Sequence, residues 1–300
     1  MTTTNGLLLI DKPAGLTSHD VVARVRQVLH EKKIGHAGTL DPMATGLLVL
    51  AVGPSTRLLR FAQSEVKRYG GTVALGAATD SLDADGTVVA EMAVPALTID
   101  DVQRVAQSML GAQYQTPPMV SALKVGGRRL HELARQGIEV EREPREINIT
   151  HLQMAATADR TTWDFEVECS VGTYVRVLLS DLAERLGTCG HLVALRRISS
   201  GSHHVDDALT LDELSARLAS GDSPVRAPRG FVEHLEHAEV GEDTERRMRM
   251  GQMLSLEGTF RTDEIAAVNL RGDLVGILRH RGDQWKPDLV LADPPAHGRG

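Results

Sequence analysis

Residues 47–52 read LLVLAV, an unbroken apolar run that a globular protein has to bury on both sides. Six residues are too few for a buried helix, and the run therefore predicts a central strand. A second apolar run, Leu7–Ile10, ends at the turn sequence DKPAG and predicts another buried strand. The chain is expected to fold around a sheet to which both strands belong.

The segment directly before the longer run, residues 35–46, reads GHAGTLDPMATG. Its single acid, Asp41, stands between a leucine and a proline. Asp-Pro is a common start of a turn and glycines supply positive φ angles, so an ordinary turn explains the segment. A carboxylate at the edge of a buried strand is equally suited to catalysis. The segment alone leaves both interpretations open.

Other strand and helix patterns alternate without a regular βαβ rhythm. Residues 162–169, TWDFEVEC, alternate apolar and acidic side chains and predict a half-buried antiparallel strand. Ser18 is expected to cap a helix that has valines at helical spacing, and Thr98 and Thr210 each begin a capping-box pattern. Together these patterns predict an α+β fold rather than a doubly wound parallel sheet.

The length of 300 residues suits one large domain and a small second one. The composition changes after about residue 200, where a helix is followed by a loop rich in Pro, Gly and Ser and then by short strands with turns. We therefore expect a main domain over residues 1–200, a helix and linker over 201–234, and a small β-rich domain over 235–300.

Composition and motifs exclude several classes of protein. The chain is 42% hydrophobic and 24% charged, as in ordinary soluble proteins, and no apolar stretch approaches the roughly 20 residues of a membrane span. The start lacks the basic region of a signal peptide, and Cys169 and Cys189 form no CxxC pair, so we expect a cytoplasmic protein. Neither a phosphate-binding GxxxxGK[ST] loop, nor GxGxxG, nor HExxH occurs. We therefore expect no cofactor and no metal.

Charge is distributed unevenly along the chain. The net charge of −7 argues against a nucleic-acid partner. Residues 12–36, however, hold five Lys or Arg against two acids, and residues 121–136 hold four against one, while residues 79–101 hold six acids and no base. This pattern fits either a basic groove for a polyanion or solvated helix and loop faces. Arg196 and Arg197 are likewise expected to be solvated or to contact phosphates.

Several segments taken together resemble one family, namely LLLIDKPAGLTSHD, GHAGTLDPMATG, KRYGGTVALG with TDSLDADG, PPMVSALKVGGRRLHELARQGIEVEREPREI, and GTYVRVLLSDLAERLGTCGHLVALRR. Their order and spacing, from about Leu7 to about Arg197, are similar to the bacterial tRNA pseudouridine synthases that act on uridine-55. The C-terminal part, with MRMGQMLSLEG before its strands, resembles the small PUA-type RNA-binding domain at the end of that family.

The resemblance implies a pseudouridine synthase fold: a mixed, largely antiparallel sheet with a central cleft, followed by a small β-rich PUA-like domain. It makes Asp41 the catalytic aspartate. The implied substrate-binding residues are His36, which enters the T loop, Tyr69, which stacks on the flipped base, the pocket residues Tyr174 and Arg176, and Leu195 as an apolar wall. An RNA-gripping thumb is implied over about residues 117–147, with the candidate contacts Lys124, Arg128, Arg129 and Arg135.

The implied reaction is the isomerisation of uridine-55 in the T loop of tRNA to pseudouridine. Moving uracil from an N1 to a C5 linkage on the same ribose carbon leaves the oxidation state unchanged, so a carboxylate can serve as nucleophile at C1′ or as base at the sugar. The implied partner is the T arm of tRNA, with no membrane, no obligatory protein partner and a monomeric chain. Two alternatives stay open: a tRNA-binding protein that mainly opens the tRNA elbow, and a guide-RNA-dependent synthase like the related archaeal and eukaryotic enzymes.

Overall fold

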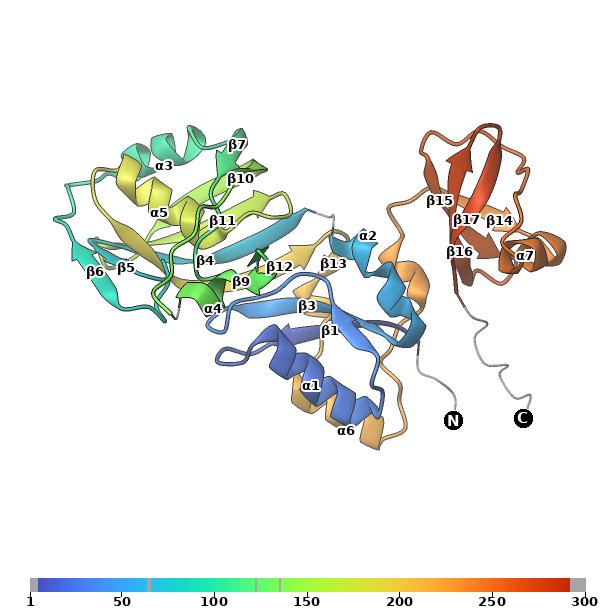
Figure 1. The fold of residues 1–300 in the computed structure, drawn as a ribbon. Coiled ribbons are helices and arrows are strands. Elements are labelled where there is room, and N and C mark those ends of the chain that lie inside the picture. Colours follow the sequence, from blue (N-terminus) through green and yellow to red (C-terminus); the bar gives the residue numbers. More distant parts are fainter. Residues whose placement is uncertain (1–4, 64–65, 122, 135, 292–300) are drawn as a thin grey trace.

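The protein is described by a computed structural model over residues 5–63, 66–121, 123–134 and 136–291 (Figure 1). Its main sheet follows the order β1-β3-β12-β4-β11-β10-β7, with β2 added to β3 and β13 to β12. The strand bounds are Gly6–Lys12 (β1), Ile34–His36 (β2), Thr45–Val52 (β3), Lys67–Leu75 (β4), Gly111–Gln115 (β7), Arg145–Ala156 (β10), Thr162–Cys169 (β11), Gly190–Ser200 (β12) and His203–His204 (β13). The predicted α+β fold with a mixed, largely antiparallel sheet is confirmed.

The two halves of this sheet meet where β3 runs beside β12. These two strands are parallel, and only two residue pairs lie directly opposite each other. Arg196 faces Thr45, and Arg197 faces Gly46. All other pairings described for the sheet are antiparallel. The apolar run 47–52 lies within β3 and is fully buried, as its sequence predicts. The start of β3 is therefore the point at which the halves are joined.

Helices cover β1 and β3 on one face. Figure 1 shows α1 (Ser18–Leu29) and α6 (Leu211–Ala219) side by side below these strands, and their apolar faces share one core. The capping box predicted at Thr210 is present. The prediction that Ser18 caps α1 is wrong, because Thr17 forms a capping box with Asp20. Ser18 is the first helical residue, and its buried side chain points elsewhere.

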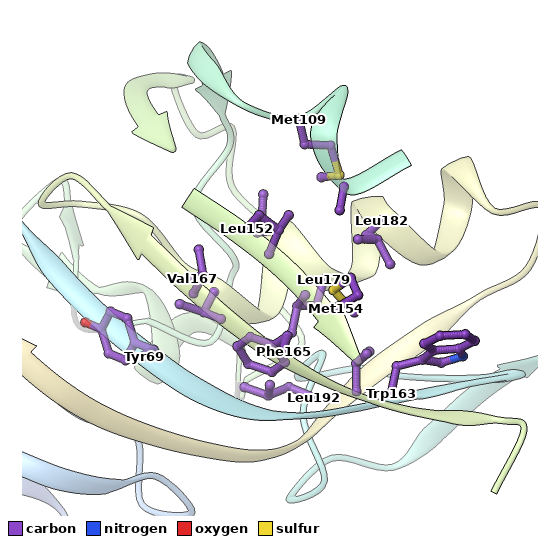
Figure 2. Close-up of a cluster of buried hydrophobic side chains, with 14 of the residues drawn as sticks. Tyr69, Met109, Leu152, Met154, Trp163, Phe165, Val167, Leu179, Leu182 and Leu192 are labelled. Carbon is purple, nitrogen blue, oxygen red and sulfur yellow. The ribbon is translucent and has the colours of Figure 1, made fainter. Parts of the chain in front are cut away.

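The other half of the sheet has its own apolar core beneath α3 (Ile99–Gln107) and α5 (Val175–Arg185). Figure 2 shows Trp163, Phe165 and Val167 projecting from β11 into this core, as the alternation of residues 162–169 predicts. Three short elements flank this half: the hairpin of β5 (Ala77–Thr79) and β6 (Val88–Glu91), the hairpin of β8 (Lys124–Val125) and β9 (Arg128–Arg129), and α4 (Leu130–Ala134).

The C-terminal residues form a second sheet in the order β14-β15-β16-β17, with α7 beside it. The bounds are His237–Val240 (β14), Glu242–Arg249 (α7), Glu264–Asn269 (β15), Leu274–Arg281 (β16) and Gln284–Val290 (β17). One face of the sheet has its own core around Trp285, and other side chains of the sheet, such as Ile277, join a core shared with the first part of the chain.

That shared core fixes the C-terminal sheet against the segment after β3, which comprises the 3-10 helix η1 (Gly53–Leu58) and α2 (Leu59–Gln63). The connection runs through η2 (Val205–Asp207) and η3 (Pro228–Phe231), and Phe231 is buried in the shared core. Arg57 Nη1 donates to the Val290 carbonyl oxygen at 2.8 Å. None of the described helices combines the length and the apolar character needed to cross a membrane.

Candidate active site

A cavity of about 410 Å³ lies between the loop before β3, strands β4 and β12, and the loop that leads into α5. Its lining includes five of the residues that the sequence predicts for the site: Asp41, Tyr69, Tyr174, Arg176 and Leu195. These residues are up to 154 positions apart in the chain (195 − 41) and come from four different segments. The cavity is thus assembled where the two halves of the main sheet meet.

The loop that carries Asp41 is held by the connection between β1 and α1. Ser18 Oγ accepts from the Leu40 backbone N–H at 2.9 Å, and it lies 3.3 Å from the Leu40 carbonyl oxygen. The Gly15 N–H donates to the Pro42 carbonyl oxygen at 2.9 Å. The residues on both sides of Asp41 are therefore anchored, so the loop holds the carboxyl group in a defined place.

The buried Lys12 side chain also anchors this loop. Its side chain is fully buried, and Nζ donates to the carbonyl oxygens of Pro13, Leu16 and Pro42 at 2.9, 2.6 and 3.2 Å. Burial lowers the pKa of Lys12 from 10.5 to about 8, although the nearby Asp41 carboxylate opposes that change. Lys12 is thus a cation next to the loop of Asp41 at neutral pH, and it contacts that loop through backbone oxygens.

Asp41 is paired with a buried arginine. Arg176 Nη1 lies 3.2 Å from Asp41 Oδ2, and the Asp41 side chain keeps 34% of its surface accessible while that of Arg176 keeps 3%. Burial raises the pKa of Asp41, Arg176 opposes this, and the neighbouring carboxylates Asp83 and Asp85 raise it further. The carboxylate is therefore poorly solvated but paired, which suits a group that has to react while still reaching a substrate.

Arg176 is itself held by a second acid that the sequence analysis missed. Asp83 Oδ2 lies 3.1 Å from Arg176 Nη1, and Asp83 Oδ1 accepts from Ser81 Oγ at 2.5 Å. Arg176 also donates to the Val120 carbonyl oxygen. Asp83 lies in the TDSLDADG segment of the resemblance. It is one of the six acids of residues 79–101, whose pattern suggests an acidic surface, but its side chain is buried.

Two aromatic rings and one leucine face the cavity from other elements. Tyr69, on β4, is only 7% exposed; Figure 2 shows it at one edge of the apolar cluster with its hydroxyl pointing away from that cluster. Tyr174 directly precedes α5 and lines the cavity together with Ser121. Burial raises the pKa of both phenols, so they are protonated at neutral pH. Leu195, on β12, is also buried and supplies an apolar wall.

His36 is placed differently from these residues. It lies at the end of β2 and is not among the residues that line the cavity. Its ring packs edge-on against that of His19, with 5.5 Å between the centroids. Burial lowers the pKa of His36 below 6.5, so the imidazole is neutral at pH 7. The role that the resemblance implies for His36 therefore requires contact with a bound RNA and not with the cavity.

The predicted thumb is only partly described. Lys124 lies in β8 and Arg129 in β9, the two strands of a short hairpin, while Arg135 lies outside the described residues. Arg128 is exposed and donates to Gln136 Oε1 at 2.7 Å. In sequence the hairpin follows the segment of Val120, whose carbonyl oxygen accepts a hydrogen bond from Arg176.

The two neighbouring arginines of β12 differ in burial, and only Arg197 contradicts the sequence-based expectation. Arg196 is half-exposed and pairs with Asp11, donating through Nη1 at 3.0 Å and Nη2 at 2.7 Å. Arg197 is 0% exposed, so the expectation that it is solvated or contacts phosphates is wrong. Its side chain points into the protein beside the cavity.

Among the described residues, no group of three or more His, Cys, Asp or Glu could hold a metal ion. Burial raises the pKa of Cys169 to about 11, so this thiol is protonated at neutral pH and is a poor nucleophile. The carboxylate of Asp41 is the group in the cavity best suited to act as nucleophile or base.

Comparison with protein families agrees with this geometry. Residues 26–175 match the family described as "TruB family pseudouridylate synthase (N terminal domain)", and residues 176–238 match "tRNA pseudouridylate synthase B C-terminal domain". The chain belongs to the TruB family of pseudouridine synthases. It is therefore an isomerase, and the enzyme class implied by the sequence motifs is confirmed.

Three curated relatives are 37%, 44% and 49% identical to this chain over the aligned residues. The "tRNA pseudouridine synthase B" of Opitutus terrae is 49% identical over 212 residues, which is 71% of this chain and 88% of that protein. The protein of the same name from Heliobacterium modesticaldum is 44% identical over 84% of this chain and 83% of its own length. The one from Mycobacterium bovis is 37% identical over 97% of both chains.

Solved structures share the fold at lower identity. A chain of a Cbf5-Nop10-Gar1 complex aligns with a TM-score of 0.75 and 23% identity, covering 96% of this chain and 85% of its own length. A chain of an H/ACA RNP bound to a substrate RNA aligns with a TM-score of 0.74 and 21% identity, over 97% of this chain and 86% of its own length. These similarities support the pseudouridine synthase fold and extend through the C-terminal sheet.

Proposed function

We propose that this enzyme converts uridine-55 in the T loop of tRNA into pseudouridine, with Asp41 as its catalytic carboxylate. The curated relatives named tRNA pseudouridine synthase B support tRNA as the substrate. The observation that carries the proposed mechanism is the Asp41 carboxylate in a cavity that two tyrosines also line, 3.2 Å from the Arg176 guanidinium.

The cavity is suited to a single flipped nucleotide. A base inside folded RNA has to leave its stack, at a cost of a few kcal/mol, and stacking on an aromatic ring returns about 1–3 kcal/mol. Tyr69 provides such a ring, and Leu195 provides an apolar surface beside it. With the base enclosed, water is displaced from the carboxylate, so the detached uracil stays in place until it is reattached.

Asp41 then assists the exchange of one glycosidic bond for another. The N1–C1′ bond breaks, the C5–C1′ bond forms, C5 loses its proton and N1 gains one, so no electrons are gained or lost overall. The ionised carboxylate acts at C1′ as nucleophile or on the sugar as base, and the pairing with Arg176 favours this ionised form against the effect of burial.

The direct test is to map pseudouridine in a T-arm transcript after incubation with the pure protein, in parallel with two Asp→Asn variants. Asp41→Asn should bind the transcript but form no product. Asp164→Asn, an exposed residue that accepts a hydrogen bond from Thr72 on the sheet, should behave like the wild type. Product from Asp41→Asn, or modification at a position other than 55, would contradict the proposal.

We also propose that the chain works alone, as a monomer, and needs neither a guide RNA nor a protein partner. The solved structures with the same fold come from RNP complexes, so their chains are parts of larger assemblies. Independence from partners therefore has to be tested for this chain. Activity of the pure chain on a bare transcript, with a monomer mass by light scattering, is the expected result. A requirement for a second RNA or protein would show that the chain acts as a component of a complex.

The RNA surface is proposed to extend from the cavity over the thumb, residues 117–147, and over the C-terminal unit, residues 235–300. Arg128 is an exposed cation of that thumb. Because phosphate contacts release counterions, binding should weaken steeply with salt, and the slope should become shallower in Arg128→Gln. An unchanged slope would remove Arg128 from the RNA surface.

A further inference from the structure

Arg197 is a fully buried cation beside the active-site cavity. Arginine keeps its charge in proteins, and a buried charge is costly unless its donors are satisfied. Among the described residues, none of the ion pairs involves Arg197. Its guanidinium donates to backbone carbonyl oxygens instead: Nε to that of Leu47 at 2.6 Å, and Nη2 to that of Gly38 at 3.2 Å.

These two carbonyl oxygens lie on opposite sides of the loop that carries Asp41. Gly38 is three residues before Asp41 (41 − 38), and Leu47 is six residues after it (47 − 41). The backbone of Arg197 lies opposite Gly46 in the parallel pair of β3 and β12. One residue therefore joins both ends of the loop and the junction between the two half-sheets.

Arg197 also holds the tyrosine of the cavity. Arg197 on β12 and Tyr69 on β4 are direct cross-strand partners, so their side chains lie next to each other on one face of the sheet. Both side chains line the cavity, and the positive charge of Arg197 lowers the pKa of the Tyr69 phenol against the effect of burial, which raises it.

We propose that Arg197 is a positioning residue for pseudouridine synthesis: its single guanidinium fixes the Tyr69 ring and the Asp41 loop relative to each other. The inference rests on the proposed roles of Asp41 and Tyr69. A buried arginine that served packing alone would need no hydrogen bonds that converge on two separate parts of the site. Displacing reacting groups by about 1 Å can cost a factor of roughly 100 in rate, so such an anchor affects catalysis directly.

The test is a double-mutant cycle between Arg197→Lys and Tyr69→Phe, measured as the single-turnover rate of pseudouridine formation on a T-arm transcript. Lysine keeps the charge but loses the planar set of donors, and phenylalanine keeps the stacking ring but loses the hydroxyl. Arg197→Lys should slow the reaction by about 10- to 100-fold, the rate equivalent of one hydrogen bond to a charged group. In the Tyr69→Phe background the same substitution should cost much less, because the phenol oxygen beside the guanidinium is already absent.

Arg196→Lys is the matched control, since it makes the same substitution at the neighbouring, half-exposed arginine and should leave the rate unchanged. Equal fold losses from Arg197→Lys in both backgrounds, with the fold retained, would overturn the proposal. If the wild type itself forms no pseudouridine, the proposed function is wrong, and this outcome differs from equal fold losses in an active enzyme.

If Arg197→Lys does not fold, the melting temperatures of tyrosine variants test the contact between Arg197 and Tyr69. Tyr69→Phe removes the phenol oxygen beside the buried Arg197 guanidinium, so its melting temperature should fall by about 2–4 °C. Tyr174→Phe, which removes the other phenol hydroxyl of the cavity, is the matched control and should leave the melting temperature unchanged. An unchanged melting temperature in Tyr69→Phe would refute the contact on which the proposal is built.

Discussion

Gly46 offers a sharp test of how closely β3 and β12 approach beside the active site. A Cβ atom at this position would lie 2.3 Å from the Arg197 carbonyl oxygen and 2.7 Å from its nitrogen, and the backbone has φ +98°. Gly111, at the start of the edge strand β7, has nearly the same φ of +94° but nothing within 4 Å of its hypothetical Cβ. The two glycines therefore separate backbone strain from steric contact.

The expected magnitudes follow from those distances. Both Gly→Ala substitutions incur the strain of a positive φ, which is about 1–3 kcal/mol. Gly46→Ala also has to push the Arg197 backbone away, and such overpacking adds about 1–3 kcal/mol. We expect Gly111→Ala to lose about 1–3 kcal/mol of the free energy of unfolding, and Gly46→Ala about 2–6 kcal/mol.

The rates should differ more than the stabilities. Moving β3 from β12 displaces the loop of Asp41 from Tyr69, so Gly46→Ala should react about 100-fold more slowly, whereas Gly111→Ala keeps the wild-type rate. Urea unfolding gives the free energies, and single-turnover pseudouridine formation gives the rates. Equal losses of stability and of rate in the two variants would show that the close approach at Gly46 is not what the site requires.

Three further predictions concern charge and the shared core. Since burial raises the pKa of Asp41, activity should fall on acidification at a higher pH than the ordinary aspartate value of 3.8 would give; a pH–rate profile that stays flat down to that value would contradict this. Because the pKa of Asp41 is raised in the folded protein, the ionised carboxylate lowers the free energy of unfolding above that pKa. Asp41→Asn should therefore unfold at a higher urea concentration than the wild type at pH 7. That advantage should shrink as the pH falls toward 3.8, and a variant that is less stable at pH 7 would refute the sign. Phe231→Ala should lower the free energy of unfolding by about 3–5 kcal/mol in a single transition, because Phe231 packs in the core shared by both sheets; two separate urea transitions would show that the C-terminal sheet unfolds on its own.

Local elements, and several of the residues that line the cavity, could be predicted from the sequence alone. The apolar run 47–52 specified β3, and the alternation of residues 162–169 specified β11, because each pattern depends only on near neighbours. Five site residues were also reached through the motifs of the family, since each motif keeps its residues in a short segment.

Burial and partners were decided by the tertiary structure alone. Asp83 had been counted among surface acids and Arg197 among surface bases, yet each is buried beside the cavity. Ser18 was expected to cap α1 and instead holds the loop of Asp41. In each case the partner lies on a segment 22 to 159 residues away, and no local pattern records which distant segment will cover a charge or complete a hydrogen bond. For Arg197 that choice is made only when the two half-sheets join at Gly46 and Arg197.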